Sequence, residues 1–150
     1  MGQYIEVNDV EYFCGKDQLT WLSQPNMTDA TTIDTDVVNG AIAAAENEID
    51  ERLYESCYEV PLVPLTSNAL VGIKRIAIQL AIWDMASGQQ IGNETQLESL
   101  KATEKTAQNK LTLYASKAST LRCQKWYDNQ TNVPVVVPPG IFGTNRVRKY

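Results

Sequence analysis

Acidic side chains between residues 46 and 55 are the first candidates for chemistry in this sequence. Glu48, Glu51 and Glu55 are three and four residues apart, so a helix would place their carboxylates on one side. Three carboxylates on one face could bind a hard metal ion such as Ca²⁺. A solvated or partner-facing helix surface gives the same pattern, and such surfaces are far more common than metal sites. We therefore predict an interaction surface here and no metal site.

Other patterns that carry chemistry are missing. The chain contains no histidine, which is the commonest general base and metal ligand. Its cysteines, Cys14, Cys57 and Cys123, are far apart and form no CxxC pair, so we expect free thiols in a reducing compartment. "DTDVVNGAIAAAE" begins like a calcium loop, but its closing residue, Glu46, falls one position late. We predict no enzyme activity and no cofactor.

Length and composition indicate one ordinary globular domain. The chain has 150 residues, of which 43% are hydrophobic and 21% are charged. This is enough for a single hydrophobic core and is typical of a soluble protein. No apolar run is long enough to span a bilayer, and the opening "MGQYIEVND" lacks the basic and apolar regions of a signal peptide. We expect neither secretion nor a membrane anchor.

Charge is distributed unevenly along the chain. Residues 1–60 hold 13 acidic and 2 basic side chains, a net charge of −11, whereas residues 61–150 hold 5 acidic and 11 basic ones, a net charge of +6. Chance distribution over solvated helix faces explains this asymmetry. An assembly in which the acidic half of one copy meets the basic half of the next explains it equally well. Both interpretations stay open on charge alone.

The spacing of apolar residues predicts an almost all-helical protein. Two short helices come first: "VNDVEYFCG", ended by Gly15, and "KDQLTWLSQP", ended by Pro25. We expect Phe13 and Trp21 on their apolar faces and expect the pair to dock on a larger element. A long helix follows, from about residue 35 to about residue 57. Its core-facing residues are Val38, Ala41 or Ile42, Ala45, Ile49 and Leu53.

A proline-clamped elbow links the long helix to the most apolar segment of the chain. In "VPLVPL", Pro61 and Pro64 cannot continue a helix and bias the preceding residues toward extended geometry. We expect Leu62 and Leu65 to pin this elbow to the core. The helix that follows, within "ALVGIKRIAIQLAIWDMAS", has hardly any polar face. It should be buried on several sides, at the centre of a bundle or against another subunit.

A last helix is predicted from about Glu94 to Leu121. Its seam residues alternate spacings of three and four, the period of left-handed helix packing. Glu104 is the only charged residue among them. The seam consists of Leu97, Leu100, Glu104, Ala107, Leu111, Tyr114, Ala118 and Leu121. The predicted fold class is therefore all-α, a small helical bundle of two short N-terminal helices and three longer ones. We place this body at residues 1–122.

Residues 123–150 are predicted to form an extended C-terminal arm. From Asn132 the tail "NVPVVVPPGIFGTNRVRKY" has proline, glycine and β-branched residues and no helical period. We expect its apolar residues to be buried against a partner and its basic residues to pair with acidic groups. A disordered tail has the same composition and is the alternative. The expected partner-binding residues are Val135, Val136, Val137, Ile141, Phe142, Arg146, Arg148, Lys149 and Tyr150.

Several short motifs occur in an order that resembles one protein family. The chain contains, in order, "YIEVNDV", "DQL", "AENEIDERL", "YEVPL" and "KRIA", from Tyr4 to Ala77. In this order and spacing it resembles the small head-tail connector or adaptor proteins of tailed bacteriophages, a group that includes a Mu-type neck protein. The resemblance is close from residue 4 to about residue 87 and covers the helix to Leu121 in outline. "SGQQIGNETQ" stands where these proteins usually carry a basic run.

This resemblance implies a structural protein of the virion, assembled in the host cytoplasm and located at the neck. Copies would form a ring of about twelve beneath the portal protein, and some such adaptors place a C-terminal arm into the portal. The ring would extend the DNA channel and join the capsid to the next neck or tail component, without sequence-specific DNA binding and without membrane contact. The residues expected at contacts between copies are Glu48, Glu51, Glu55, Lys74 and Arg75. The alternative is a helical DNA-binding or regulatory protein of the phage, which the acidic body disfavours.

Overall fold

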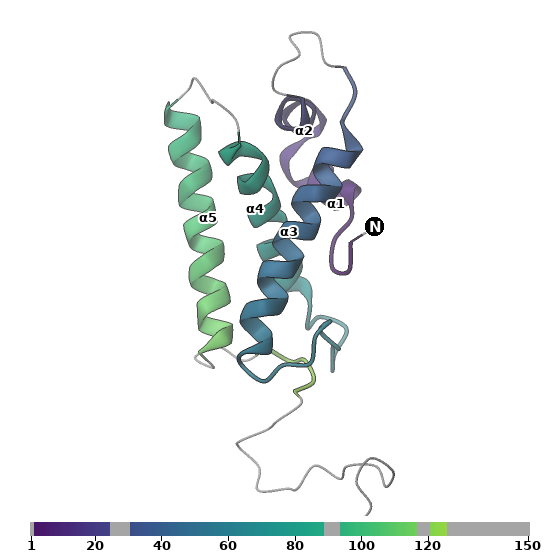
Figure 1. The fold of residues 1–150 in the computed structure, drawn as a ribbon, viewed down its shortest axis with the longest axis vertical. Helices are drawn as coiled ribbons and strands as arrows, with labels where there is room; N and C mark the ends of the chain where they lie inside the picture. The colour runs from purple at the N-terminus through teal and green to yellow at the C-terminus, as the bar shows by residue number, and fades with distance from the viewer. Residues whose placement is uncertain (1, 25–30, 89–93, 117–120, 126–150) are drawn as a thin grey trace, which may run out of the picture.

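The computed structural model describes residues 2–24, 31–88, 94–116 and 121–125 (Figure 1). These residues form five α-helices, and the only extended pairing within the described ranges is a set of isolated bridges. The helices are α1 (Val7–Cys14), α2 (Lys16–Ser23), α3 (Thr35–Tyr54), α4 (Val71–Ser87) and α5 (Glu94–Ala115). The prediction of an all-α protein with two short and three longer helices is confirmed. The predicted arm from residue 126 onward lies outside the described residues, and the division of the chain after residue 122 stays a prediction.

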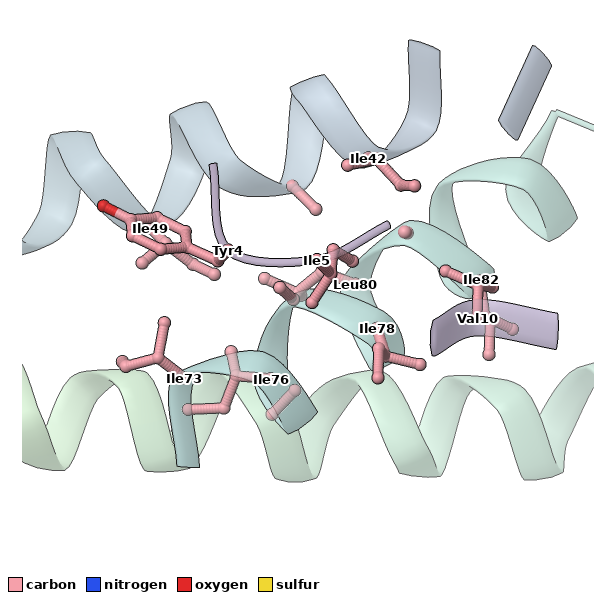
Figure 2. Close-up of a cluster of buried hydrophobic side chains, with 14 of the residues drawn as sticks. Tyr4, Ile5, Val10, Ile42, Ile49, Ile73, Ile76, Ile78, Leu80 and Ile82 are labelled. Atoms are coloured by element: carbon pink, nitrogen blue, oxygen red, sulfur yellow. The ribbon is translucent and has the colours of Figure 1, made fainter. Parts of the chain in front are cut away.

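The main bundle consists of α3, α4 and α5, with α4 packed against both of the others. In Figure 1, α3 and α5 run from the upper to the lower end of the molecule and α4 returns between them. Ile73, Ala77 and Ala81 of α4 are completely buried, and seven further side chains of this helix are buried as well. Figure 2 shows the isoleucines of α4 gathered with Ile42 and Ile49 of α3 in one cluster. The expectation that this apolar helix is buried on several sides is confirmed.

The α1–α2 hairpin packs against α3 and α4 at the upper end of the molecule (Figure 1). Its turn is Gly15, whose φ of 87° is one that glycine adopts without strain. Leu19 and Leu22 are completely buried and anchor the hairpin. Phe13 and Trp21 were also expected on the apolar faces, but they are 44% and 38% exposed. Phe13 lines a groove together with residues of α4 and α5, which leaves its ring partly open to solvent.

A carboxylate of α3 holds the N-terminal segment against the bundle. Glu46 is only 5% exposed, and its two oxygens accept the backbone N–H groups of Gln3, Tyr4 and Ile5 at 2.8, 2.6 and 3.1 Å. Three hydrogen bonds to a charged acceptor offset the cost of burying it. Glu46 therefore belongs to the fold, although it lies in the same acidic stretch as Glu48.

Tyr4 ties α3 to the elbow. Its ring lies beside Ile49 in the buried cluster (Figure 2). Its hydroxyl donates a hydrogen bond to Asp50 of α3. The same hydroxyl accepts the backbone N–H of Leu62 at 2.9 Å. Burial, and then the bond to Asp50, raises the pKa of Tyr4, and burial also raises the pKa of Asp50. Leu62 is 5% exposed, so the prediction that it pins the elbow to the core is confirmed.

The elbow, residues 58–65, pairs with residues 121–125, the last described segment. Two isolated antiparallel bridges and three backbone hydrogen bonds join them. The N–H of Glu59 donates to the carbonyl of Gln124 at 3.0 Å, and the N–H of Gln124 donates to the carbonyl of Val63 at 2.8 Å. The N–H of Leu65 donates to the carbonyl of Arg122 at 2.9 Å. The side chain of Leu65 is 66% exposed, so the prediction that it reaches the core is wrong. Backbone pairing holds this end of the elbow instead.

The last helix is shorter than predicted. α5 ends at Ala115, whereas the apolar seam predicted a helix to Leu121. Leu121 is 4% exposed, but it reaches the core from the extended segment and not from a helix. The spacing of Leu121 fits the seam because it is a core residue, yet pairing with the elbow requires extended backbone there. Ala118, another seam residue, lies outside the described residues.

Candidate contact surfaces between subunits

A groove of about 250 Å³ opens on the surface of the bundle and is lined by residues of α3, α4 and α5. Three carboxylates line it, those of Glu48, Asp84 and Glu104, together with the amide of Gln108 and the half-buried ring of Trp83. We call this the acidic groove. Glu104 is the residue that interrupts the otherwise apolar seam of α5, and its position explains why a carboxylate is tolerated there: the groove leaves it access to solvent.

Glu48 and Gln108 connect α3 to α5 across the acidic groove. Gln108 Nε2 donates to Glu48 Oε1 at 2.7 Å, and Arg52 Nη2 lies 3.7 Å from the same oxygen. The amide oxygen of Gln108 is buried and has no hydrogen-bond partner among the described residues. A buried carbonyl oxygen without a donor costs about 1–3 kcal/mol. A donor supplied from outside the described part of the chain would therefore stabilise this arrangement.

Glu51 and Glu55 continue the row of carboxylates toward the lower end of α3. They follow Glu48 by about one and two helical turns, and both are exposed. The prediction that these three glutamates share one side of a helix agrees with the helix that the structure shows. We call the acidic groove together with Glu51 and Glu55 the acidic surface. The described residues contain no group of three or more His, Cys, Asp or Glu side chains placed to bind a metal ion.

A second groove, of about 240 Å³, opens where α4 and α5 meet at the lower end. Arg75 and Lys110 give it a positive charge, and Leu113 and Tyr114 line it as well. Its floor depends on Gly72, because a Cβ at this position would lie 2.7 Å from the hydroxyl oxygen of Tyr114. Only a residue without a side chain lets Tyr114 approach α4 so closely. We call this the basic groove.

The basic side chains of this region are exposed and lack acidic partners in the described ranges. Lys74, Arg75 and Lys110 are all exposed, and the one ion pair within 4.0 Å in those ranges joins Arg52 to Glu48. The basic groove therefore keeps its positive charge available to another molecule.

The two grooves lie on opposite sides of α5. Gln108 lines the acidic groove and Lys110 lines the basic groove, and two residues along an α-helix correspond to a rotation of about 200°. Residues of α4 and α5 line both grooves, whereas α3 lines only the acidic groove. One copy thus presents acidic and basic surfaces in different directions.

The structure separates the residues that the sequence suggested for contacts between copies into two sets. Glu48, Glu51 and Glu55 form the acidic set, and Arg75 lines the basic groove; Lys74 is exposed on α4 but lines neither groove. The predicted partner-binding residues of the arm all lie outside the described residues. The sequence did not identify Asp84, Gln108 or Lys110 as contact residues, because their places in the grooves depend on side chains that become neighbours only in the folded structure. The only hint was the charged residue at position 104 in the seam of α5.

None of the helices in the described ranges is both long and apolar enough to cross a membrane.

Comparison with known proteins identifies a family. The family model described as "Bacteriophage Mu, Gp36" matches residues 4–132, which include all five helices and both grooves. The chain therefore belongs to this family and is a Mu-type phage protein. No curated protein matches the chain significantly.

Proposed function

We propose that this member of the Bacteriophage Mu Gp36 family is a structural protein of the virion, a head-tail connector. In this proposal its copies form a ring beneath the portal protein, extend the DNA channel and join the capsid to the next neck or tail component. The family match supports a phage protein. The more specific role rests on the shape and charge of the body and on the motif order that resembles connector proteins.

The observation that carries the proposal is the pair of oppositely charged grooves on opposite sides of one rigid bundle. A ring built from one kind of subunit needs two different, complementary surfaces on each copy, because every contact is head-to-tail. The buried α4 and the clamped N-terminal segment give a stiff body that can hold these surfaces at a fixed angle.

The arm supplies the proposed contact with the portal. The described chain ends at Lys125 at the lower end of the molecule (Figure 1), and 25 residues follow it. A segment of this length can span on the order of 80 Å when extended, whereas α5 itself is about 33 Å long. The arm can therefore reach a neighbouring ring, where its valines and its basic residues near the C-terminus would bind the portal protein.

DNA is proposed to pass through the ring without being held. An acidic channel lining would repel the phosphates, whereas a basic channel lining would bind them through counterion release. The alternative function, a helical DNA-binding or regulatory protein, requires an isolated protein that binds duplex DNA with a strong salt dependence.

Quantitative peptide mass spectrometry on purified phage particles tests the proposal. The expected result is a copy number close to that of the portal protein, about twelve for a closed connector ring. Absence from purified particles, combined with salt-dependent binding of the isolated protein to duplex DNA, would replace the connector with the regulatory alternative. Absence from particles alone already rejects the connector.

A further inference from the structure

We propose that Arg75 and Lys110 of one copy bind to the acidic surface of a second copy, beside Glu51 and the buried amide of Gln108. This inference deepens the proposed function and rests on it, because it assigns the contact that would close the connector ring. The occupant of the acidic surface is a second copy of this chain, and the groups that meet are an ammonium and a guanidinium on one side and carboxylates on the other.

The first support is that the charges lie at the same level along the bundle. α3 and α5 run in the same direction, and the Glu48–Gln108 hydrogen bond marks a common level on both (Figure 1). Glu51 lies three residues further along α3 and Lys110 two residues further along α5, about 4.5 and 3 Å at 1.5 Å per residue. Copies related by rotation about an axis parallel to the bundle keep these levels, so the opposite charges meet without a vertical shift.

The second support is the unsatisfied oxygen of Gln108. Its amide nitrogen is used by Glu48, which leaves a buried acceptor with no donor in the described residues. Lys and Arg side chains offer only donors, three on an ammonium and five on a guanidinium. A basic side chain entering the acidic groove from a second copy would satisfy this oxygen and pair with the carboxylates in the same step.

The third support is the chemical lining of the two grooves. Trp83 in the acidic groove offers an aromatic surface of the kind that binds a guanidinium group. Leu113, which lines the basic groove, is 47% exposed, and this apolar side chain would lose water when a second copy covers it. The contact would therefore combine charge pairing with burial of apolar surface, as stable subunit contacts do.

Charge reversal on the full-length protein tests the contact. One variant reverses the acidic surface, with Glu51→Lys and Glu55→Lys, and the other reverses the basic groove, with Arg75→Glu and Lys110→Glu. All four side chains are exposed, so the fold should tolerate the changes, and circular dichroism checks that it does. Self-association is measured by sedimentation velocity at low salt over a range of protein concentrations.

We expect the wild type to associate at low salt and to dissociate as salt is added, because exposed charge pairs are screened. Each reversed variant alone should associate at least about tenfold more weakly, since like charges then meet. An equimolar mixture of the two should recover association, because the acidic surfaces of one variant fit the basic surfaces of the other. The control variant, Glu98→Lys with Lys101→Glu, changes exposed α5 residues outside both grooves and should behave as the wild type.

A wild type that stays monomeric at low salt overturns the inference, as do reversed variants that associate normally or a mixture that does not recover. These results are separate from the particle measurement. A protein that is present in particles but associates independently of these charges remains a connector with a different contact. A protein that associates through these charges but is absent from particles keeps the contact and loses the connector role.

Discussion

The buried carboxylate of Glu46 accepts the backbone N–H of Tyr4 at 2.6 Å, across 42 residues of sequence. This bond and its two companions fasten the start of the chain to the middle of α3. The contact has no periodic pattern in the sequence, yet it fixes where Tyr4 enters the core.

Replacing Glu46 with alanine should lower the free energy of unfolding by about 3 kcal/mol, because three backbone N–H groups lose a charged acceptor. Urea unfolding followed by circular dichroism measures this loss. Asn47→Ala, at the next and exposed position of α3, is the matched control and should change stability little. A loss below about 1 kcal/mol for Glu46→Ala would show that the N-terminal segment contributes little to the fold.

The raised pKa of Tyr4 predicts a loss of stability in alkaline solution. The unfolded tyrosine ionises near pH 10, about its ordinary value, whereas the folded one stays neutral to higher pH because of burial and its bond to Asp50. The unfolded state therefore binds fewer protons above about pH 10, and the folded state loses stability there by up to about 1.4 kcal/mol per pH unit. Below pH 10 the contribution of this group is fully present.

Tyr4→Phe removes this group and should flatten the pH dependence above about pH 10 while lowering stability at neutral pH by about 1–2 kcal/mol. Unfolding by urea at a series of pH values, for both proteins, gives the comparison. The pKa of Tyr58 is also raised by burial, but this residue is present in both proteins and cancels. Parallel pH profiles for the two proteins would contradict the prediction.

Leu111→Asp should destabilise the protein by about 4 kcal/mol, because it places an unpaired charge at a completely buried position of α5. Leu113→Asp, two residues further along α5, changes a side chain that is 47% exposed in the wild type and should lower the stability far less. Thermal unfolding of both variants measures the difference. Similar melting temperatures would mean that α5 does not pack against the bundle through Leu111.

Two truncations separate the arm from the fold. A chain that ends at Asn132 should keep the melting temperature of the full protein and lose stable attachment to the portal protein. A chain that ends at Thr120 should also melt at a lower temperature, because it lacks the buried side chains of Leu121 and Cys123. Cosedimentation with portal rings and thermal unfolding provide the two measurements. Portal attachment by the chain that ends at Asn132 would remove the arm from the proposal.

Local spacing was enough to predict the helices and their buried sides. Val38, Ile49 and Leu53 recur at the helical period, and the structure buries all three completely. The apolar stretch around Ile76 correctly predicted a central helix. These successes share one cause: burial against neighbours leaves a repeating pattern within a single helix.

Long-range polar contacts left no such pattern. The bonds from Glu46 to the N-terminal segment and the pairing of residues 58–65 with 121–125 join parts of the chain that are far apart in sequence. The same pairing explains why the seam extended the last helix too far. Glu48, Glu51 and Glu55 were placed on one side correctly, but the grooves could not be predicted, because Gln108 and Lys110 acquire their roles only from the helices beside them.

The pairing between the elbow and residues 121–125 also has a mechanical consequence. Tension applied to the chain beyond Lys125 would first load the three backbone hydrogen bonds that join this segment to the elbow. The elbow passes the load to α3 through the hydroxyl of Tyr4 and to α4 directly along the chain. A pull on one end of the molecule is thus divided between two helices of the bundle before the last turn of α5 carries it alone.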